Sequence, residues 1–166
     1  YNDSEFQEDI FCANYSYPEK PRFTPFVITE HSYDWTSGDG RPEASDEMAI
    51  NFVKSFAEPM NYYYSNRLCA GGIGWSMFDY NNEVNYTRTG HLFFSGIYDI
   101  FRCEKPVAYL YRSQKSPEEE TVLYIVNRWT KSPEGGLTRV MVLSNCEEAE
   151  LFVNGRPAGR IRPNAY

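Results

Sequence analysis

The sequence predicts an α/β fold in which the last strands of a (β/α)8 TIM barrel lead into an incomplete all-β sandwich. Two observations indicate the first part. Over residues 1–115 short apolar runs alternate with helix-like segments, and polar residues close each apolar run. One observation indicates the second part: from residue 116 onward, short β-type runs follow one another with turn residues between them. We therefore predict two partial domains, at residues 1–115 and 116–166.

Three short apolar runs are predicted to be strands, at residues 9–13, 26–29 and 71–78. The run at 26–29 is apolar on both faces, which is typical of a parallel strand buried between two layers. The runs end in the polar clusters Asn14-Tyr15-Ser16, Glu30-His31-Ser32 and Asp79-Tyr80-Asn81-Asn82. In a (β/α)8 barrel, side chains at the C-terminal ends of the strands face the active site. These three clusters are therefore where we expect a site.

A helix is predicted from about Ser45, because apolar residues recur there at helical spacing and Asp46 and Glu47 favour a helix N-terminus. The recurring apolar residues are Met48, Phe52, Val53 and Phe56. Pro59 is predicted to interrupt this helix, with one or two further turns over residues 60–66. A second helix is predicted at about residues 106–111.

The second part of the chain contains four β-type runs, at residues 121–129, 137–143, 149–153 and 156–161. Asn154-Gly155 predicts a two-residue hairpin turn, because both residues tolerate a positive φ. Gly135-Gly136 marks another turn. Four strands begin an antiparallel sandwich but are too few to complete one.

The composition excludes some classes of binding partner and function. A net charge of −7 argues against nucleic acid and disfavours an anionic membrane surface, since both attract a surplus of Lys and Arg. Aromatic residues make up 17% of the chain and suit the faces of sugars, although an aromatic β-rich core explains them equally.

No metal cluster, phosphate-binding glycine loop or apolar run of roughly 18 residues is visible in the sequence, so we predict no metal, no cofactor and no membrane span. The four cysteines are widely spaced and are predicted to be buried, and they leave the compartment open.

Glu30 is the residue to which the chemistry points. A carboxylate directly after a buried strand is costly unless it is solvated, paired or used. Strand alternation aligns Glu30 with Phe26 and Ile28 and predicts that it tops the inner face of the barrel. The alternative is a carboxylate at the rim that takes part in a salt bridge.

Several segments resemble glycoside hydrolase family 2. Residues 25–31, PFVITEH, resemble the nucleophile strand of that family, and residues 71–81, GGIGWSMFDYN, resemble its eighth barrel strand. Residues 99–102, 105–109 and 111–114 are similar to the end of its barrel. Residues 147–156, EEAELFVNGR, resemble a hairpin of the immunoglobulin-like domain that follows in its beta-galactosidases. The segments occur in the family's order and cover nearly the whole chain.

The resemblance implies a retaining double-displacement mechanism in which Glu30 attacks the anomeric carbon. It implies that Tyr15 hydrogen-bonds this nucleophile and that Trp75 forms a wall beneath the sugar. Asp79 and Asn81 are expected to bind sugar hydroxyls or, alternatively, to cap the following loop. The acid/base residue sits on an earlier strand in the family and has no counterpart here, so we expect this chain to be inactive alone.

The implied substrate is a beta-galactoside or a galactose-containing polysaccharide. Other family 2 activities, beta-glucuronidase or beta-mannosidase, are the nearest alternatives, and a non-catalytic carbohydrate-binding module is the alternative from another class. Three of eight barrel strands leave open sheet edges. We therefore expect the remainder of the same polypeptide to complete the barrel, or copies of the chain to form a homo-oligomer.

Overall fold

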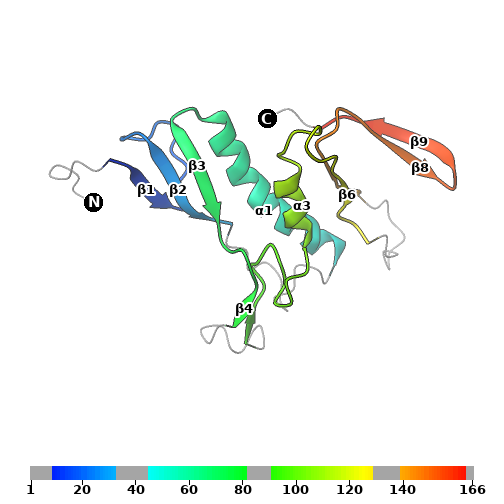
Figure 1. Cartoon of the computed structure of the whole chain (residues 1–166), viewed down its shortest axis with the longest axis horizontal. Coiled ribbons are helices and arrows are strands. Elements are labelled where there is room, and N and C mark those ends of the chain that lie inside the picture. Colours follow the sequence, from blue (N-terminus) through cyan, green and yellow to red (C-terminus); the bar gives the residue numbers. More distant parts are fainter. Residues whose placement is uncertain (1–8, 33–44, 82–90, 129–138, 164–166) are drawn as a thin grey trace.

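The computed structural model describes residues 9–32, 45–81, 91–128 and 139–163 (Figure 1). Its first part is a three-stranded parallel sheet of β1 (Phe11–Asn14), β2 (Phe26–His31) and β3 (Cys69–Gly74), which are neighbours in chain order. Helix α1 (Asp46–Ser65) connects β2 to β3 and covers one face of this sheet. The predicted parallel strands and the helix between them are confirmed.

The start of α1 follows from its sequence. The Ser45 hydroxyl accepts a hydrogen bond from the backbone N–H of Met48 at 3.1 Å, and Asp46 and Glu47 occupy the first turn. Seven residues of the helix are buried: Ala49, Ile50, Phe52, Val53, Phe56, Pro59 and Met60. The helix therefore has one continuous apolar face, as its spacing predicts.

The prediction that Pro59 interrupts the helix is wrong, because α1 continues through it to Ser65. Proline has no N–H to donate to the carbonyl four residues earlier, which here belongs to Ser55. The Ser32 hydroxyl, at the end of β2, donates to this carbonyl at 2.7 Å. The hydrogen bond that the helix lacks is thus replaced from the sheet, and His31 Nδ1 in turn lies against the Ser32 hydroxyl.

Strand β3 ends earlier than the predicted run 71–78. After Gly74 the backbone leaves the sheet: the N–H of Trp75 still donates to the carbonyl of His31 at 2.8 Å, but that of Ser76 donates to the carbonyl of Ser95 at 3.1 Å. The chain then forms the short pair β4 (Tyr80–Asn81) and β5 (Leu92–Phe93). The partner of the segment after residue 75 is therefore the segment near residue 95.

Helix α3 (Pro106–Arg112) precedes the predicted boundary, and two antiparallel pairs follow it. These are β6 (Leu123–Ile125) with β7 (Val142–Ser144), and β8 (Ala149–Val153) with β9 (Arg156–Ile161). The strand predicted at 121–129 is shorter, because at Asn127 the side chain, instead of the backbone, forms the hydrogen bonds to the opposite segment. It accepts from the N–H of Met141 at 2.8 Å and donates to the carbonyl of Arg139 at 2.7 Å.

One apolar cluster joins the two parts. It contains the buried face of α1, Val107 and Leu110 of α3, and Val126 and Leu143 from the β6–β7 region. The described residues on either side of the predicted boundary near residue 115 therefore share a core. The domain boundary itself stays a prediction.

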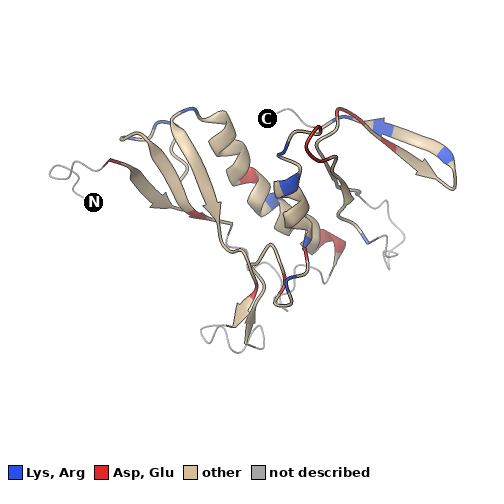
Figure 2. Cartoon of the chain, viewed as in Figure 1, with Lys and Arg blue, Asp and Glu red and all other residues tan. Residues whose placement is uncertain are grey.

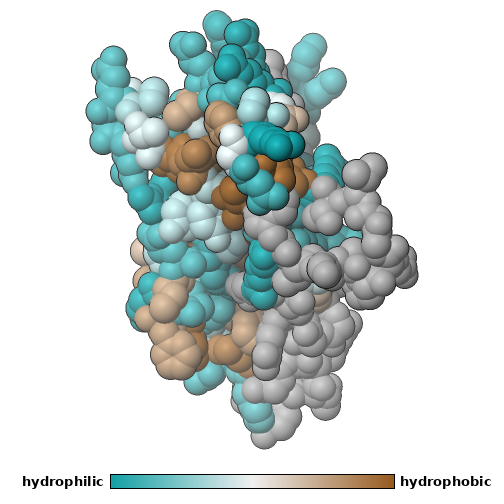
Figure 3. Space-filling view, turned by 90° about the vertical axis from the view of Figure 1, so that its right-hand side faces the viewer, coloured by the Kyte–Doolittle hydropathy of each residue, from teal (hydrophilic) through white to brown (hydrophobic). Residues whose placement is uncertain are grey.

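The β8–β9 hairpin turns at Asn154-Gly155, whose φ angles of 50° and 75° confirm the predicted turn. Acidic and basic segments lie side by side on it (Figure 2), and Arg160 pairs with Glu148 at 3.3 Å and Glu150 at 3.1 Å. Its apolar residues are 38% to 57% exposed: Leu151, Phe152, Val153 and Ile161. Figure 3 shows hydrophobic surface on the side of the molecule that carries this hairpin.

Three of the four cysteines differ from their predicted burial. Cys69 is buried, Cys146 is partly exposed, and Cys12 and Cys103 are exposed. In β1 the partly buried residues Phe11 and Ala13 pack with the Phe26 cluster that faces α1, so alternation places Cys12 on the opposite face.

The Ser32 contact can be tested by a double-mutant cycle of Ser32→Ala and Pro59→Ala. Ser32→Ala should lower the free energy of unfolding by about 1–3 kcal/mol, because it leaves the Ser55 carbonyl without its donor. In the Pro59→Ala background the restored N–H bonds that carbonyl, so the cost of Ser32→Ala should fall by about 0.5–1.5 kcal/mol. Denaturant unfolding measures both terms, and an equal cost in the two backgrounds would contradict this account.

Candidate active site

The C-terminal ends of β1, β2 and β3 meet at one edge of the parallel sheet. The backbone N–H of Tyr15 donates to the carbonyl of Glu30 at 2.8 Å, and the N–H of Trp75 donates to the carbonyl of His31 at 2.8 Å. These two bonds extend the pairing one residue beyond β1 and β3. The structure thus places the predicted residues Tyr15, Glu30 and Trp75 at three adjacent strand ends.

Two side chains hold the Glu30 carboxylate. The Tyr15 hydroxyl donates to Oε1 at 2.8 Å, which confirms the predicted contact. The Asn14 amide donates to Oε2 at 3.1 Å, and the Thr29 hydroxyl donates to Oδ1 of Asn14 at 2.7 Å. The sequence analysis missed Asn14 and Thr29. Asn14 opens the polar cluster after the first strand, but only the strand register shows which way its amide faces.

The prediction that Glu30 shares a face with Phe26 and Ile28 is wrong. Phe26 and Ile28 face α1 and are fully buried in a cluster with Tyr62 and Tyr63 of that helix. Glu30 does not share their face, because the register shifts at Thr29: Ala13 pairs with Ile28, but Asn14 pairs with Glu30. This bulge turns Glu30 towards Asn14 and Tyr15.

His31 lies on the α1 side of the sheet. It is fully buried, and its ring centroid is 6.0 Å from those of Phe56 and Tyr63. The Ser32 hydroxyl donates its hydrogen to the Ser55 carbonyl, so it must accept a hydrogen bond from His31. The proton of the neutral imidazole therefore lies on Nδ1. Nε2 has no hydrogen-bond partner among the described residues. Burial lowers the pKa of His31 from 6.5 to about 4, so the ring is neutral at pH 7.

Glycines on β3 make room for this layer. A side chain at Gly74 would place its Cβ 2.7 Å from the Tyr111 hydroxyl and 2.9 Å from the Phe56 ring. Gly72, where a Cβ would lie 2.7 Å from the Tyr63 ring, and Gly74 therefore allow close packing between the sheet and the helices.

Trp75 is 39% exposed, and its indole N–H donates to the hydroxyl of Tyr80 at 3.0 Å. The two rings meet edge to face at 6.0 Å. Tyr80 thus fixes one edge of the indole at the strand end next to Glu30. Asn81 is exposed on β4, where it pairs with Leu92 of β5.

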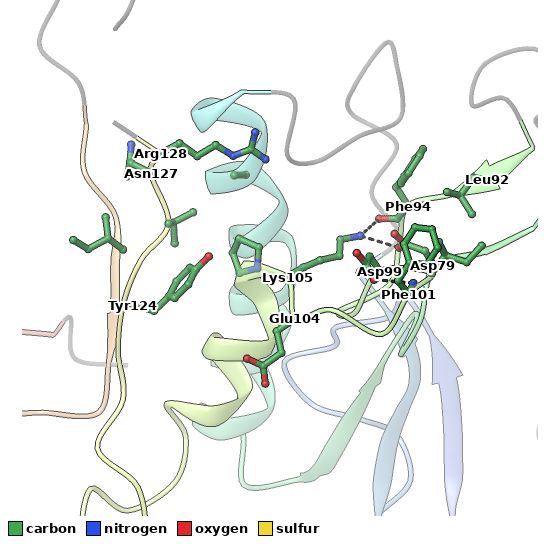
Figure 4. Close-up of a pocket in the computed structure, with 15 residues that line it drawn as sticks. Asp79, Leu92, Phe94, Asp99, Phe101, Glu104, Lys105, Tyr124, Asn127 and Arg128 are labelled. Carbon is green, nitrogen blue, oxygen red and sulfur yellow. Dashed lines mark hydrogen bonds and ion pairs between the residues drawn. The ribbon is translucent and has the colours of Figure 1, made fainter. Parts of the chain in front are cut away.

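Asp79 is placed differently from the sugar-binding role that was expected. Its carboxylate is buried and accepts hydrogen bonds at Oδ1 from Lys105 Nζ and the N–H of Gly96, both at 2.8 Å. Figure 4 shows the Lys105 amine directed at Asp79 and at the carbonyl of Phe94, beside a cavity of about 610 Å³. These contacts join Asp79 to residues beyond β5. The alternative, that Asp79 caps the loop that follows, concerns residues outside the described ones and stays a prediction. The sequence analysis missed Lys105, because 26 residues separate it from Asp79.

Within the four described ranges, no three His, Cys, Asp or Glu side chains are grouped so that they could hold a metal ion. In the same ranges, neither α1 nor α3 has the length and apolar character that a membrane crossing requires.

Lys105→Met tests the buried ion pair. The variant leaves the Asp79 charge buried without its cation, so the free energy of unfolding should fall by about 3–5 kcal/mol. Lys115→Met is the matched control, because Lys115 forms a solvent-exposed pair with Glu120 and should cost about 1 kcal/mol or less. Similar losses in the two variants, measured by denaturant unfolding, would show that Asp79 does not depend on Lys105.

Burial of neutral His31 predicts acid sensitivity. Its pKa is about 4 in the folded protein and 6.5 when exposed, so the unfolded state binds a proton first as the pH falls. The stabilisation should therefore be complete above pH 6.5 and decline between pH 6.5 and 4. His31→Phe keeps the ring contacts and removes the titration, so its melting temperature should fall less than that of the wild type over this range. An unchanged pH dependence in the variant would rule out His31 as the source.

Comparisons with known proteins agree with this arrangement. A beta-galactosidase of Thermoanaerobacter pseudethanolicus is 31% identical over 173 residues, covering 98% of this chain and 23% of that protein. A beta-galactosidase of Rhizobium meliloti is 35% identical over 141 residues, covering 79% of this chain and 18% of that protein. Residues 135–166 match the family described as Domain of unknown function (DUF4982).

Among solved structures, a beta-glucuronidase from glycoside hydrolase family 2 superposes with a TM-score of 0.66 at 20% identity. The superposition covers 99% of this chain and 18% of that one. The chain thus spans about a fifth of the length of the relatives that it matches. With the segments in the family's order and the matches running along the chain, it belongs to glycoside hydrolase family 2.

Proposed function

We propose that the protein carrying this chain is a retaining glycosidase that cleaves terminal beta-galactosides, with Glu30 as its nucleophile. The observation that carries the proposal is the Glu30 carboxylate, which two donors orient at the C-terminal edge of a parallel sheet, with Trp75 at the end of the neighbouring strand. In this proposal β1, β2 and β3 are the last strands of a (β/α)8 barrel, and β6 to β9 begin an immunoglobulin-like sandwich. The superposition with a family 2 structure supports both assignments.

The proposed reaction has two steps. In the first, a Glu30 oxygen bonds to the anomeric carbon while the bond to the leaving oxygen breaks, and a protein carboxylic acid gives its proton to that oxygen. In the second, water attacks the same carbon with loss of its proton to the same acid/base, and Glu30 leaves as a carboxylate. The acid/base lies outside this chain and should stand about 5–5.5 Å from Glu30 in the complete protein.

The other residues have supporting roles in the proposal. Tyr15 orients Oε1 through its hydroxyl. Trp75 offers a flat face for the sugar, with its N–H turned to Tyr80 rather than to the substrate. Asn81 is retained as a ligand for sugar hydroxyls, while Asp79 is not, because its carboxylate is buried against Lys105.

The relatives favour a galactoside, since those with 31% and 35% identity are named beta-galactosidases. The second candidate is a beta-glucuronidase, the activity named for the superposed structure. A glucuronate carboxylate calls for a cation at the site. Lys105 is held by Asp79 and the carbonyl of Phe94, which places it away from that task.

The test is Glu30→Gln in the complete protein, assayed with nitrophenyl galactoside, glucuronide and mannoside. The wild type should release nitrophenol fastest from the beta-galactoside. Glu30→Gln should lose a factor of about 10³ or more, because the amide cannot form the glycosyl-enzyme. A 2-deoxy-2-fluoro-galactoside should label Glu30, as detected by peptide mass spectrometry.

Three results would count against the proposal. Preference for the glucuronide would select the second candidate. Turnover that survives in Glu30→Gln would remove Glu30 from the chemistry. A protein that binds galactosides equally in both forms and hydrolyses none would be a carbohydrate-binding module.

A further inference from the structure

The two oxygens of Glu30 are held in different ways. Oε1 takes its hydrogen bond from the hydroxyl of Tyr15, a side chain that is 42% exposed. Oε2 takes its hydrogen bond from the amide of Asn14. A phenol hydroxyl turns about its C–O bond and can change its acceptor, whereas an amide donor moves only with its whole side chain.

The Asn14 amide is fixed at both ends. Its Oδ1 accepts from the Thr29 hydroxyl at 2.7 Å, and its Nδ2 donates to Oε2 at 3.1 Å. Exchanging the amide oxygen and nitrogen would set an oxygen against the carboxylate, which only accepts hydrogen bonds when ionised. The carboxylate therefore decides that Asn14 presents its donor to Glu30, and the Thr29 hydroxyl holds the other end of the amide in place.

The two hydrogen bonds of the Asn14 side chain, to Thr29 and to Glu30, are called the Asn14–Thr29 clamp. The β-bulge makes this clamp possible. Asn14 pairs with Glu30 while Ala13 pairs with Ile28, so Thr29 is the extra residue between the two pairs. Thr29 and Glu30, which are adjacent in sequence, can then both reach the Asn14 side chain. In a regular strand adjacent side chains point to opposite faces.

We propose that Asn14, oriented by Thr29, is a positioning residue that holds Oε2 as the carbonyl oxygen of the glycosyl-enzyme and leaves Oε1 as the attacking atom. The inference rests on the proposed function of Glu30. When Oε1 bonds to the anomeric carbon, the leaving oxygen departs with a proton from the acid/base, and Oε2 becomes the carbonyl oxygen of an ester. When water adds to that carbon, the Oε1 bond breaks and both oxygens share the charge again.

The chemistry of an ester matches the two donors. The carbonyl oxygen of an ester remains a good hydrogen-bond acceptor, whereas the bridging oxygen is a poor one. The fixed amide suits the oxygen that keeps its hydrogen bond through both steps. The rotatable hydroxyl of Tyr15 suits the oxygen that must release its hydrogen bond as the bond to carbon forms. A donor that needs no reorganisation is what lowers the barrier.

The sharpest test compares Thr29→Val with Thr29→Ser in the complete protein. Valine keeps the shape and removes the hydroxyl, so the Asn14 amide loses the hydrogen bond that holds its Oδ1 in place. Thr29→Val should lower kcat/KM for dinitrophenyl galactoside about 10-fold, whereas Thr29→Ser keeps the hydroxyl and should restore most of the rate. Asn14→Ala should cost about 10²-fold, as for other single donors to a reacting oxygen.

A pH profile separates positioning from simple packing. Asn14→Asp puts a second carboxylate beside Glu30, so the acidic limb of kcat/KM should move to higher pH, because a like charge disfavours the ionised nucleophile. Asn14→Ala removes one donor and adds no charge, so it should lower the rate and displace that limb less. Unfolding midpoints are measured for each variant, and the Thr29→Val and Thr29→Ser pair carries the test if a variant at Asn14 fails to fold.

The outcomes are distinct. If Glu30→Gln abolishes turnover while Thr29→Val and Asn14→Ala retain wild-type rates, the clamp is overturned and the proposed function stands. Equal rates for Thr29→Val and Thr29→Ser, or an acidic limb that Asn14→Asp leaves in place, also overturn it. If Glu30→Gln itself remains active, the proposed function fails first, and the clamp fails with it.

Discussion

A missing hydrogen bond organises the structure around the site. Pro59 cannot donate to the carbonyl of Ser55, and the Ser32 hydroxyl fills that place from the end of β2. The same hydroxyl meets His31, so the strand end is tied to the middle of α1 through two consecutive residues. An ordinary helix would satisfy this carbonyl internally and offer no anchor. The proline thus removes one hydrogen bond from the helix, and the sheet gains a fixed point two residues after Glu30.

The bulge at Thr29 lets one short strand serve two surfaces. Phe26, Ile28 and His31 are all fully buried, the first two with Tyr62 and Tyr63 and the third between Phe56 and Tyr63. Regular alternation would send residues 28 and 30 to one face and residue 31 to the other. One extra residue keeps His31 in the core and turns Glu30 to Asn14 and Tyr15. Packing on one side and polar geometry on the other are therefore set by the same irregularity.

Helix α1 links the parallel sheet to the second part of the chain. One end of its buried face meets β3, and the rest shares an apolar cluster with α3, Val126 and Leu143. Its first residue, Asp46, also accepts from the N–H of Arg128 at 2.9 Å. Helix α1 thus packs both against the parallel sheet that carries the proposed site and against the β6–β7 region. The β8–β9 hairpin, by contrast, exposes its large apolar residues.

The sequence by itself determined the order of the elements, the start of α1, the Asn154-Gly155 turn and the pairing of Tyr15 with Glu30. These depend on local periodicity, capping and turn chemistry, or on segments that resemble a known family. The tertiary structure decided the rest: the face on which Glu30 lies, the continuation of α1 through Pro59, the burial of Asp79 and the Asn14–Thr29 clamp. Each of these depends on contacts between residues 15 to 26 positions apart, or on a shift of register, and neither leaves a periodic trace in the sequence.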